Sequence, residues 1–180
     1  MSRVLLCCAA SAALHKGCDL ASKLTQASHQ VRTILTPRAA RLVAPQLFEA
    51  VTGEPAYVDE FAPERRGAMD HVDLAAWAEI AVVAPCSADL AGRLALGLAD
   101  DLVTTALLAL PAGVPRLVAP AMNPSMLAHP AVARNLATLR ADGWRVLEPA
   151  EGRLACRDEG PGRLPEPETV VAAVADLLGR

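Results

Sequence analysis

Aromatic residues, long apolar runs and excess positive charge are all lacking in this chain. Phe, Trp and Tyr make up 3% of the 180 residues, although 53% of the residues are hydrophobic, mostly Ala, Leu and Val. No apolar run reaches the roughly 18 to 20 residues that a membrane span requires. The net charge of -3 also lacks the basic excess of a nucleic-acid surface. These absences argue against a membrane protein and against a nucleic-acid partner.

Signatures of disulfides, metal sites and common nucleotide sites are missing too. The five cysteines stand at positions 7, 8, 18, 86 and 156, an odd number without the paired spacing of a zinc site. We interpret them as reduced thiols of a cytoplasmic protein, and we expect no metal. Neither a G-x-G-x-x-G pattern nor a P-loop occurs, so NAD and ATP are not indicated.

Strand-like and helix-like stretches alternate along the chain, and its length suits a single domain over residues 1–180. Such alternation is typical of parallel βαβ units, so we expect an α/β fold. The expected strands are Val4–Ala9, Val31–Leu35, Ile80–Ala84, Arg116–Ala119 and Trp144–Leu147. The expected helices are Ala12–Ser28, Arg38–Val51, His71–Ala78, Leu90–Leu96, Asp101–Leu110, Ala131–Ala141 and Glu168–Leu178.

Two segments interrupt the alternation. Residues 53–69 contain two prolines and several charges, which favours an irregular connection. Residues 148–167 are rich in proline and glycine and are too long for an ordinary connection. Long loops of this kind often act as lids, so we expect residues 148–167 to form a flap over a binding site.

Small and hydroxyl-bearing residues follow three of the expected strands. They are Ala10, Ser11 and Ala12 after the first strand, Thr36 after the second, and Ser87, Ala88, Asp89 and Leu90 after the third. Free N–H groups at such helix starts favour phosphate, and three turns of this kind predict a composite site for a phosphorylated cofactor. For Ser11 alone, a plain helix N-cap is the alternative. Asp89 would face cofactor hydroxyl groups or cap a helix.

The segment Pro120–Met126 directly follows the expected strand Arg116–Ala119. Ligands of open α/β sheets bind beyond the carboxyl ends of the strands, so this segment is a candidate substrate site. The Asn123 carboxamide can hold a carboxylate without changing charge, and capping of the next helix is an equal alternative. Met122 either packs in the core or contacts a flat ring through its polarizable sulfur.

His71 and Cys156 are candidates for proton transfer. His71 starts an expected helix after residues 53–69, and an imidazole there is suited to general acid and base chemistry, with a capping histidine as the alternative. Cys156 lies between arginines in the segment 148–167, surroundings suited to a reactive thiol, with an inert loop cysteine as an equal alternative. His15, His29 and His129 have no comparable setting, and we expect no site role for them.

Five motifs occur in an order and spacing that resemble one known family. They are His71–Leu74 with Trp77, Ala84–Asp89, Gly97–Leu102, Pro120–Asn123 and Cys156–Pro167. Together they are similar to the flavin-dependent cysteine decarboxylases, and the similarity extends from residue 3 to about residue 175. Five separate matches at proper spacing are unlikely to arise by chance.

The resemblance implies a three-layer α/β/α fold of the flavodoxin or Rossmann type. It also implies homotrimers, often arranged as homododecamers, with FMN between neighbouring subunits. The residues implied to surround the FMN are Ala10, Ser11, Ala12, Thr36, Ser87, Ala88, Asp89, Leu90 and Ala121.

The implied reaction is the FMN-dependent decarboxylation of 4′-phosphopantothenoylcysteine to 4′-phosphopantetheine in coenzyme A biosynthesis. By this resemblance His71 is the acid and base of oxidation and decarboxylation, Asn123 holds the substrate carboxylate, and Cys156 protonates the enethiolate. Met122 and Arg163 contact the substrate, and residues 148–167 close over it as a clamp.

Departures from the family pattern leave other functions open. Arg157, Leu164 and Pro165 replace the residues that are usual in the clamp, which bears on substrate identity more than on FMN. One alternative is the oxidative decarboxylation of a C-terminal peptide cysteine, and another is a noncatalytic regulatory flavoprotein. Because the chain ends at Arg180, we expect the synthetase that supplies the substrate to be a separate protein.

Overall fold

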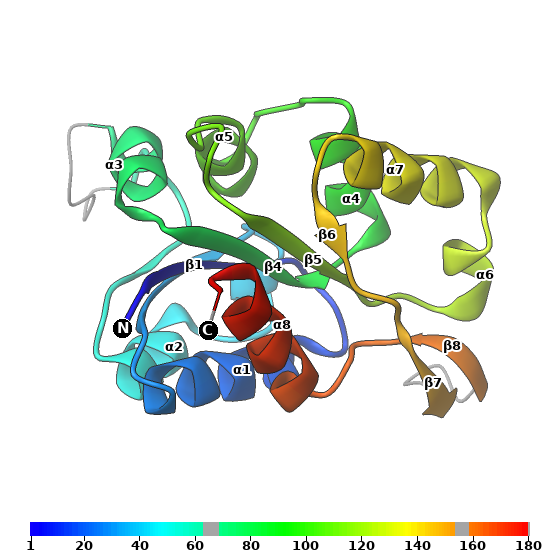
Figure 1. Cartoon of the computed structure of the whole chain (residues 1–180), viewed down its shortest axis with the longest axis horizontal. Coiled ribbons are helices and arrows are strands. Elements are labelled where there is room, and N and C mark those ends of the chain that lie inside the picture. Colours follow the sequence, from blue (N-terminus) through cyan, green and yellow to red (C-terminus); the bar gives the residue numbers. More distant parts are fainter. Residues whose placement is uncertain (63–68, 154–158, 180) are drawn as a thin grey trace.

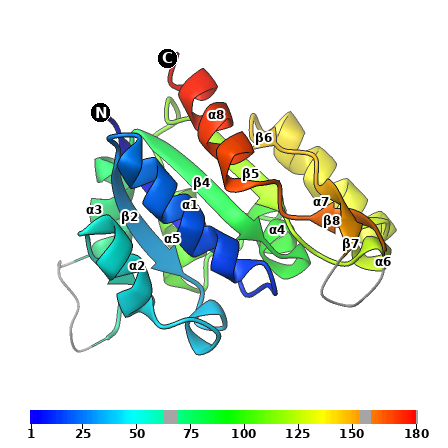
Figure 2. The same cartoon turned by 90° about the horizontal axis from the view of Figure 1, so that it is seen from below.

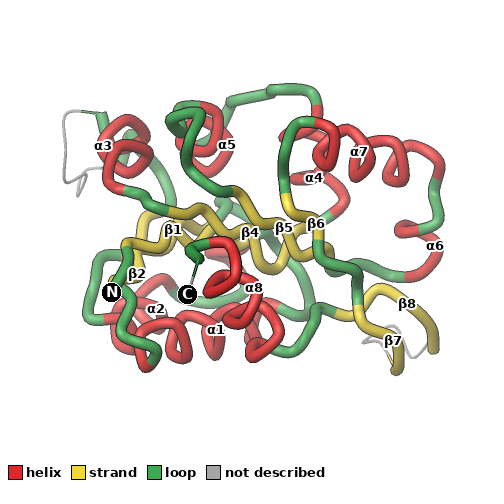
Figure 3. The backbone as a smooth tube through the Cα atoms, in the orientation of Figure 1, coloured by secondary structure: helices red, strands yellow, loops and turns green. Residues whose placement is uncertain are grey.

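Six parallel strands form the centre of the molecule in the order β3-β2-β1-β4-β5-β6 (Figures 1 and 3). They are β1 (Arg3–Cys8), β2 (Gln30–Leu35), β3 (Ala56–Tyr57), β4 (Ile80–Cys86), β5 (Arg116–Pro120) and β6 (Arg145–Val146). The computed structural model describes residues 1–62, 69–153 and 159–179. Every residue of β4 is buried, as expected for a parallel strand that is covered on both faces.

Helices cover both faces of the sheet, so the predicted three-layer α/β/α fold is confirmed (Figure 1). One layer holds α1 (Leu14–Gln26), α2 (Pro45–Thr52) and α8 (Pro167–Leu177). The other layer holds α3 (Asp70–Trp77), α4 (Ala88–Ala95), α5 (Leu102–Leu108) and α7 (Pro130–Ala141). Each layer packs its own apolar cluster against one face of the sheet.

The beginning of α1 is held close to the end of β4. A side chain at Gly17 would place its Cβ 3.2 Å from Cδ of Pro85 and 3.3 Å from the carbonyl oxygen of Ala84. Only glycine allows this approach without a shift of the strand. The backbone N–H of Ala9 also donates to the Pro85 carbonyl at 2.9 Å. These contacts bring the turns after β1 and β4 together at one edge of the sheet.

Helices α1 and α8 lie side by side on their face of the sheet (Figure 2). Two ion pairs join them: Lys16 with Glu166, which precedes α8, and Lys23 with Glu168. The residues just before α8 are thereby held beside the first turn of α1.

The predicted helix Arg38–Val51 is wrong as a single element. A short 3-10 turn (η1, Ala39–Arg41) comes first, and α2 begins only at Pro45. Proline has no N–H and disfavours helical geometry in the residue before it, and Ala44 has an extended conformation with φ -64° and ψ 134°.

Both segments predicted to be irregular contain strands. The first includes β3, and the second includes an antiparallel hairpin of β7 (Ala150–Arg153) and β8 (Glu159–Arg163). Glycine-rich strands carry few β-branched or aromatic residues, so no periodic signal indicated this hairpin. None of the helices within the described ranges is long and apolar enough to cross a lipid bilayer.

Candidate functional site

Two adjoining cavities open at the carboxyl ends of the central strands. The first has a volume of about 480 Å³ and the second about 400 Å³. Both are lined by Ala10, Ser87, Ala88 and Met126, which makes them two halves of one site. This is the edge at which an open α/β sheet binds ligands, and it is where the sequence predicts the site.

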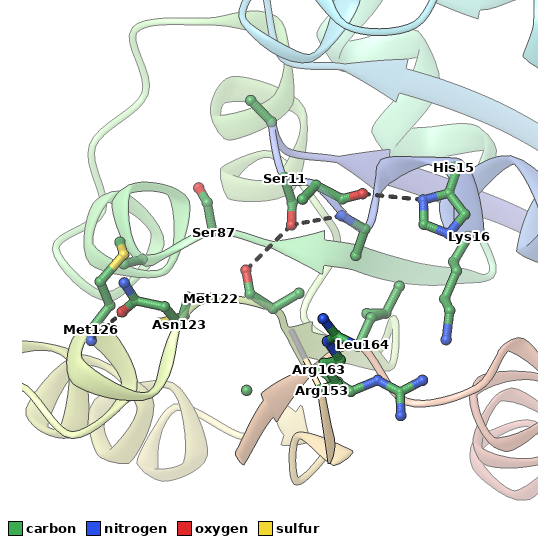
Figure 4. Close-up of a pocket in the computed structure, with 16 residues that line it drawn as sticks. Ser11, His15, Lys16, Ser87, Met122, Asn123, Met126, Arg153, Arg163 and Leu164 are labelled. Carbon is green, nitrogen blue, oxygen red and sulfur yellow. Dashed lines mark hydrogen bonds between the residues drawn. The ribbon is translucent and has the colours of Figure 1, made fainter. Parts of the chain in front are cut away.

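The turn after β1 presents small side chains and one hydroxyl to the first cavity (Figure 4). Ser11 Oγ accepts a hydrogen bond from the Ala13 N–H at 3.2 Å and lies 3.5 Å from the Ala121 carbonyl oxygen. The N-cap of α1 is Ala13, so Ser11 lies before the cap rather than at it. Its hydroxyl links the turns after β1 and β5, and Ala12 and Ala121 line the same cavity.

Two further hydroxyls lie at the turns after β2 and β4. Thr36 Oγ1 accepts from the Ala39 N–H at 3.2 Å, and Ser87 is the N-cap of α4, with Oγ accepting from the Leu90 N–H at 3.2 Å. Thr36 lines the second cavity. The Leu90 side chain is buried in the apolar core and lines neither cavity.

Three aspartates line the second cavity. Asp89 lines it, but the cap of α4 is Ser87, so the predicted cap alternative for Asp89 is wrong. Arg93 pairs with Asp100 and, at 2.8 Å, with Asp101. Burial raises the pKa of Asp101, but hydrogen bonds from Arg93 and Thr104 outweigh burial and hold this pKa below its usual range.

Asn123 lies in the wall of the first cavity and also caps α6 (Pro124–Leu127). Its Oδ1 accepts a hydrogen bond from the Met126 N–H at 2.7 Å. The capping alternative is therefore confirmed, and it is compatible with a ligand role because Nδ2 is a separate donor. Met122 precedes it and lines the same cavity with 8% of its surface exposed.

The hairpin supplies the opposite wall of the first cavity. Arg163 and Leu164 line it. Leu164 is 2% exposed and packs against the core beneath α1 and α8, so this departure from the family pattern forms an apolar wall. Pro165 is buried beside it. Cys156 and Arg157 lie outside the described residues.

His71 lies apart from this site. It is in the first turn of α3, at the opposite end of the molecule from α6 (Figure 1). Its Nδ1 is 2.6 Å from Oε2 of Glu60, and it lines neither cavity. A single chain therefore does not bring His71 to Asn123.

The sequence did not predict three of the basic residues that line the first cavity. His15 and Lys16 line it from the first turn of α1, and Arg153 lines it from β7. The sequence predicted no site role for His15. Its position about one helical turn after the turn that follows β1 was the signal that could have placed it in the cavity wall. His129, by contrast, caps α7 through Nδ1, which confirms its structural interpretation.

The cysteines that the structure describes are free and buried. Burial raises the pKa of Cys7, Cys8 and Cys86 well above the usual range, so these thiols are structural. Within the described ranges, no group of three or more His, Cys, Asp or Glu side chains is arranged to hold a metal ion.

The fold, with cavities at the ends of its strands, defines an α/β protein of the flavodoxin type. A model of the Flavoprotein family matches residues 1–179, and the chain belongs to that family.

Relatives of known identity include the coenzyme A biosynthesis bifunctional protein CoaBC. The chain is 46% identical to CoaBC of Bacillus subtilis and 49% identical to CoaBC of Mycobacterium tuberculosis, over 93% of its own length in each case. It spans only 41% and 39% of those two proteins.

Solved structures of similar fold include two decarboxylases. A PPC decarboxylase mutant in complex with pantothenoylaminoethenethiol is 29% identical, with a TM-score of 0.88 and 99% of each chain covered. The FMN-dependent cysteine decarboxylase SpaF is 30% identical, with a TM-score of 0.82, 99% of this chain covered and 98% of that chain.

Proposed function

We propose that this chain decarboxylates 4′-phosphopantothenoylcysteine to 4′-phosphopantetheine with bound FMN, a step of coenzyme A biosynthesis. The observation that carries the proposal is the placement of Asn123 in a cavity wall beyond β5, opposite a hairpin with two arginines. Identities of 46% and 49% to the CoaBC proteins support the same activity.

The cavities at the strand ends suit FMN in their volume and in the hydrogen-bonding groups that line them. Alanines at three turns leave room for a flat ring to approach the backbone, and hydroxyls of Ser11, Thr36 and Ser87 match a ribityl phosphate. Bound FMN would supply the oxidation of the substrate cysteine to a thioaldehyde and the later return of the hydride. The residues proposed to hold FMN are Ala10, Ser11, Ala12, Thr36, Ser87, Ala88, Asp89, Leu90 and Ala121.

The protein residues would position the substrate and move protons. Asn123 Nδ2 would donate to the substrate carboxylate until it leaves as CO2, and Met122 would form the apolar floor beside it. Cys156 would deliver a proton to the enethiolate carbon, and Arg163 would contact the remainder of the substrate. Closure of the hairpin would exclude water from the thioaldehyde.

His71 would act on the substrate of a neighbouring subunit. One chain keeps α3 and α6 at opposite ends, which supports a site shared between two copies of the chain (Figure 1). Such sharing accords with the homotrimer that we propose, alone or within a homododecamer. In it the carboxylate of Glu60, 2.6 Å from Nδ1, would orient the imidazole that exchanges the proton.

A paired substrate assay tests this function. The purified protein, reconstituted with FMN, is incubated in parallel with 4′-phosphopantothenoylcysteine and with a peptide that ends in cysteine, and products are identified by mass spectrometry. We expect loss of CO2 from the first substrate and a reduced thiol as product. Conversion of the peptide alone to an enethiol would instead establish a peptide decarboxylase, and a protein that binds FMN without turning over either substrate would be noncatalytic.

A further inference from the structure

The charge around the first cavity is one-sided. Every ionisable side chain among its described lining residues is basic: His15, Lys16, Arg153 and Arg163. The second cavity carries three aspartates against two arginines, and the whole chain has a net charge of -3. A local excess of cations in an acidic protein attracts an anionic ligand to the first cavity rather than to the second.

A single carboxylate next to the cavity is shared by two of these cations. Lys16 Nζ lies 2.8 Å from both carboxylate oxygens of Glu166, and Arg163 Nη2 lies 3.2 Å from one of them. The hydrogen bond from Lys16 and the charge of Arg163 lower the pKa of Glu166, which reflects the positive field. Arg153 lies opposite Glu159 in the hairpin but forms no ion pair with it or with any other described residue, so its charge is left for a ligand.

The hairpin holds Arg163 in a fixed place. Its Nη1 donates to the Glu151 carbonyl at 3.4 Å and lies only 2.8 Å from where a Cβ of Gly152 would be. Gly152 has φ +133°, a conformation that other residues rarely adopt. The Arg163 guanidinium thus packs against Gly152, where a side chain would obstruct it. Arg153 follows directly in β7 and lines the same cavity.

These cations and Asn123 lie on different sides of the cavity. Figure 4 shows Asn123 and Met126 on one side, and Arg153, Arg163 and Lys16 on the other. A ligand that fills the cavity from Asn123 therefore has its far end among the cations. Guanidinium groups bind phosphate through paired N–H donors, and the lysine ammonium adds a point charge.

We propose that Lys16, Arg153 and Arg163 bind the phosphate group of a phosphomonoester substrate whose carboxylate end lies at Asn123. The inference rests on the proposed function and extends it, because it makes this cation cluster the element that selects phosphorylated over unphosphorylated substrate. Arg153 and Lys16 are then specificity residues that take no part in proton transfer.

A kinetic comparison of two substrates tests the cluster. We expect wild-type protein to favour 4′-phosphopantothenoylcysteine over pantothenoylcysteine by about tenfold or more in kcat/KM, the scale of a charge-assisted contact. Arg153→Gln and Lys16→Gln should each raise KM for the phosphorylated substrate and leave kcat/KM for pantothenoylcysteine unchanged. Arg153→Lys should keep part of the preference. An unchanged preference in both Gln variants would overturn the proposal.

A matched variant controls for loss of charge elsewhere. Arg140 lies on α7, pairs with Glu148 and lines neither cavity. Arg140→Gln removes the same charge, so it should leave both kcat/KM values as in the wild type. A general electrostatic effect would lower the preference in all three variants alike, which would contradict a specific phosphate site.

FMN also carries a phosphate group, and a binding titration separates the two sources of phosphate. We expect the FMN dissociation constant, measured by quenching of flavin fluorescence, to be the same in wild-type and Arg153→Gln protein. A weaker FMN complex with an unchanged substrate preference would assign the cluster to FMN and overturn the proposal.

The phosphate site and the proposed reaction can fail separately. If neither substrate loses CO2, the proposed function is wrong, and calorimetric titration with phosphopantetheine and pantetheine then decides the inference. Binding of phosphopantetheine about tenfold tighter, with that difference lost in Arg153→Gln, would support the phosphate site. Equal binding of the two compounds would overturn it.

Discussion

The backbone N–H of Met122 donates a hydrogen bond to the Gly162 carbonyl at 3.0 Å. This bond joins the turn after β5 to the second strand of the hairpin. The residues next to its two ends are Asn123 and Arg163, which we propose to contact opposite ends of the substrate. The distance between these two groups therefore depends on how the hairpin packs against the segment that carries Asn123.

A side chain at Gly160 should weaken substrate binding through this connection. Gly160 has φ +151°, and a Cβ there would lie 3.3 Å from Cγ of Pro124, at the start of α6. Gly160→Ala should push the hairpin away from α6 and cost about 1 to 3 kcal/mol of backbone strain, concentrated in the hairpin. We expect a raised KM and an unaltered flavin spectrum, measured by steady-state kinetics and by absorbance.

Gly113→Ala provides the matched control. Nothing lies within 4 Å of a Cβ built at Gly113, so this change should leave both KM and melting temperature as in the wild type. Equal kinetics in Gly160→Ala and Gly113→Ala protein would show that the contact between the hairpin and α6 does not position the substrate.

Two substitutions at Asn123 separate its structural role from its proposed chemical role. Asn123→Asp keeps an oxygen acceptor for the Met126 N–H, so the cap of α6 should persist, but it removes the Nδ2 donor and adds a negative charge. We expect a melting temperature near that of the wild type and almost no CO2 release. Asn123→Ala should lose the cap as well, at a cost of about 0.5 to 2 kcal/mol in the free energy of unfolding.

Thermal denaturation and CO2 release, measured on the same preparations, give the comparison. Full activity in Asn123→Asp protein would contradict the role of Asn123 in carboxylate binding, because two carboxylates repel each other. Stability losses of the same size in the Asp and Ala variants would show that the Asn123 side chain stabilises the fold by more than capping α6.

The sheet and the position of the site were predictable because both follow from local patterns. Buried strands such as β4 are continuous apolar runs, and ligands of such sheets bind where these runs end. The turn at Ser11 and the segment at Asn123 were located in this way. The break before Pro45 was also encoded locally, since proline forbids a continuous helix there, but the strong apolar pattern around it obscured the signal.

Other features depend on contacts that no local pattern contains. Arg153 reaches the cavity only because a glycine-rich hairpin folds over the strand ends, and such hairpins have no periodic signature. Lys16 and His15 line the first cavity from the start of α1, which approaches β4 closely at Gly17. His71 could be selected by its residue type, but no local pattern indicates that α3 lies far from Asn123 within one chain.

Protonation of Asp101 should destabilise the protein at low pH. Its folded-state pKa is lowered, so its ionised form stabilises the fold above the unfolded value of 3.8, and this stabilisation is lost as the pH falls through the lower folded value. Asp101→Asn should lower the free energy of unfolding by roughly 1 to 2 kcal/mol at pH 7, because the charged bond to Arg93 is lost. Asparagine still offers an acceptor for the Thr104 N–H.

Urea denaturation of both proteins between pH 7 and pH 3 measures this effect. The difference between wild type and Asp101→Asn should shrink towards pH 3, since below pH 3.8 the unfolded chain binds a proton at Asp101 more readily than the folded protein does. A difference that stays constant over this range would mean that the carboxylate charge contributes nothing to stability. The Glu148→Gln variant is a control, because Glu148 pairs with Arg140 while 81% exposed and exposed pairs contribute little.

Activity should return when two inactive variants are mixed, if the site is shared between subunits. His71→Asn and Asn123→Asp should each be inactive alone, since every site in either homo-oligomer lacks one group. Mixed oligomers, formed by coexpression with two different affinity tags, contain some sites that combine the intact His71 of one copy with the intact Asn123 of another. Because α3 and α6 lie at opposite ends of one chain, such sites require two copies (Figure 1). Mixed oligomers without activity, at the same flavin content as the wild type, would contradict a shared site.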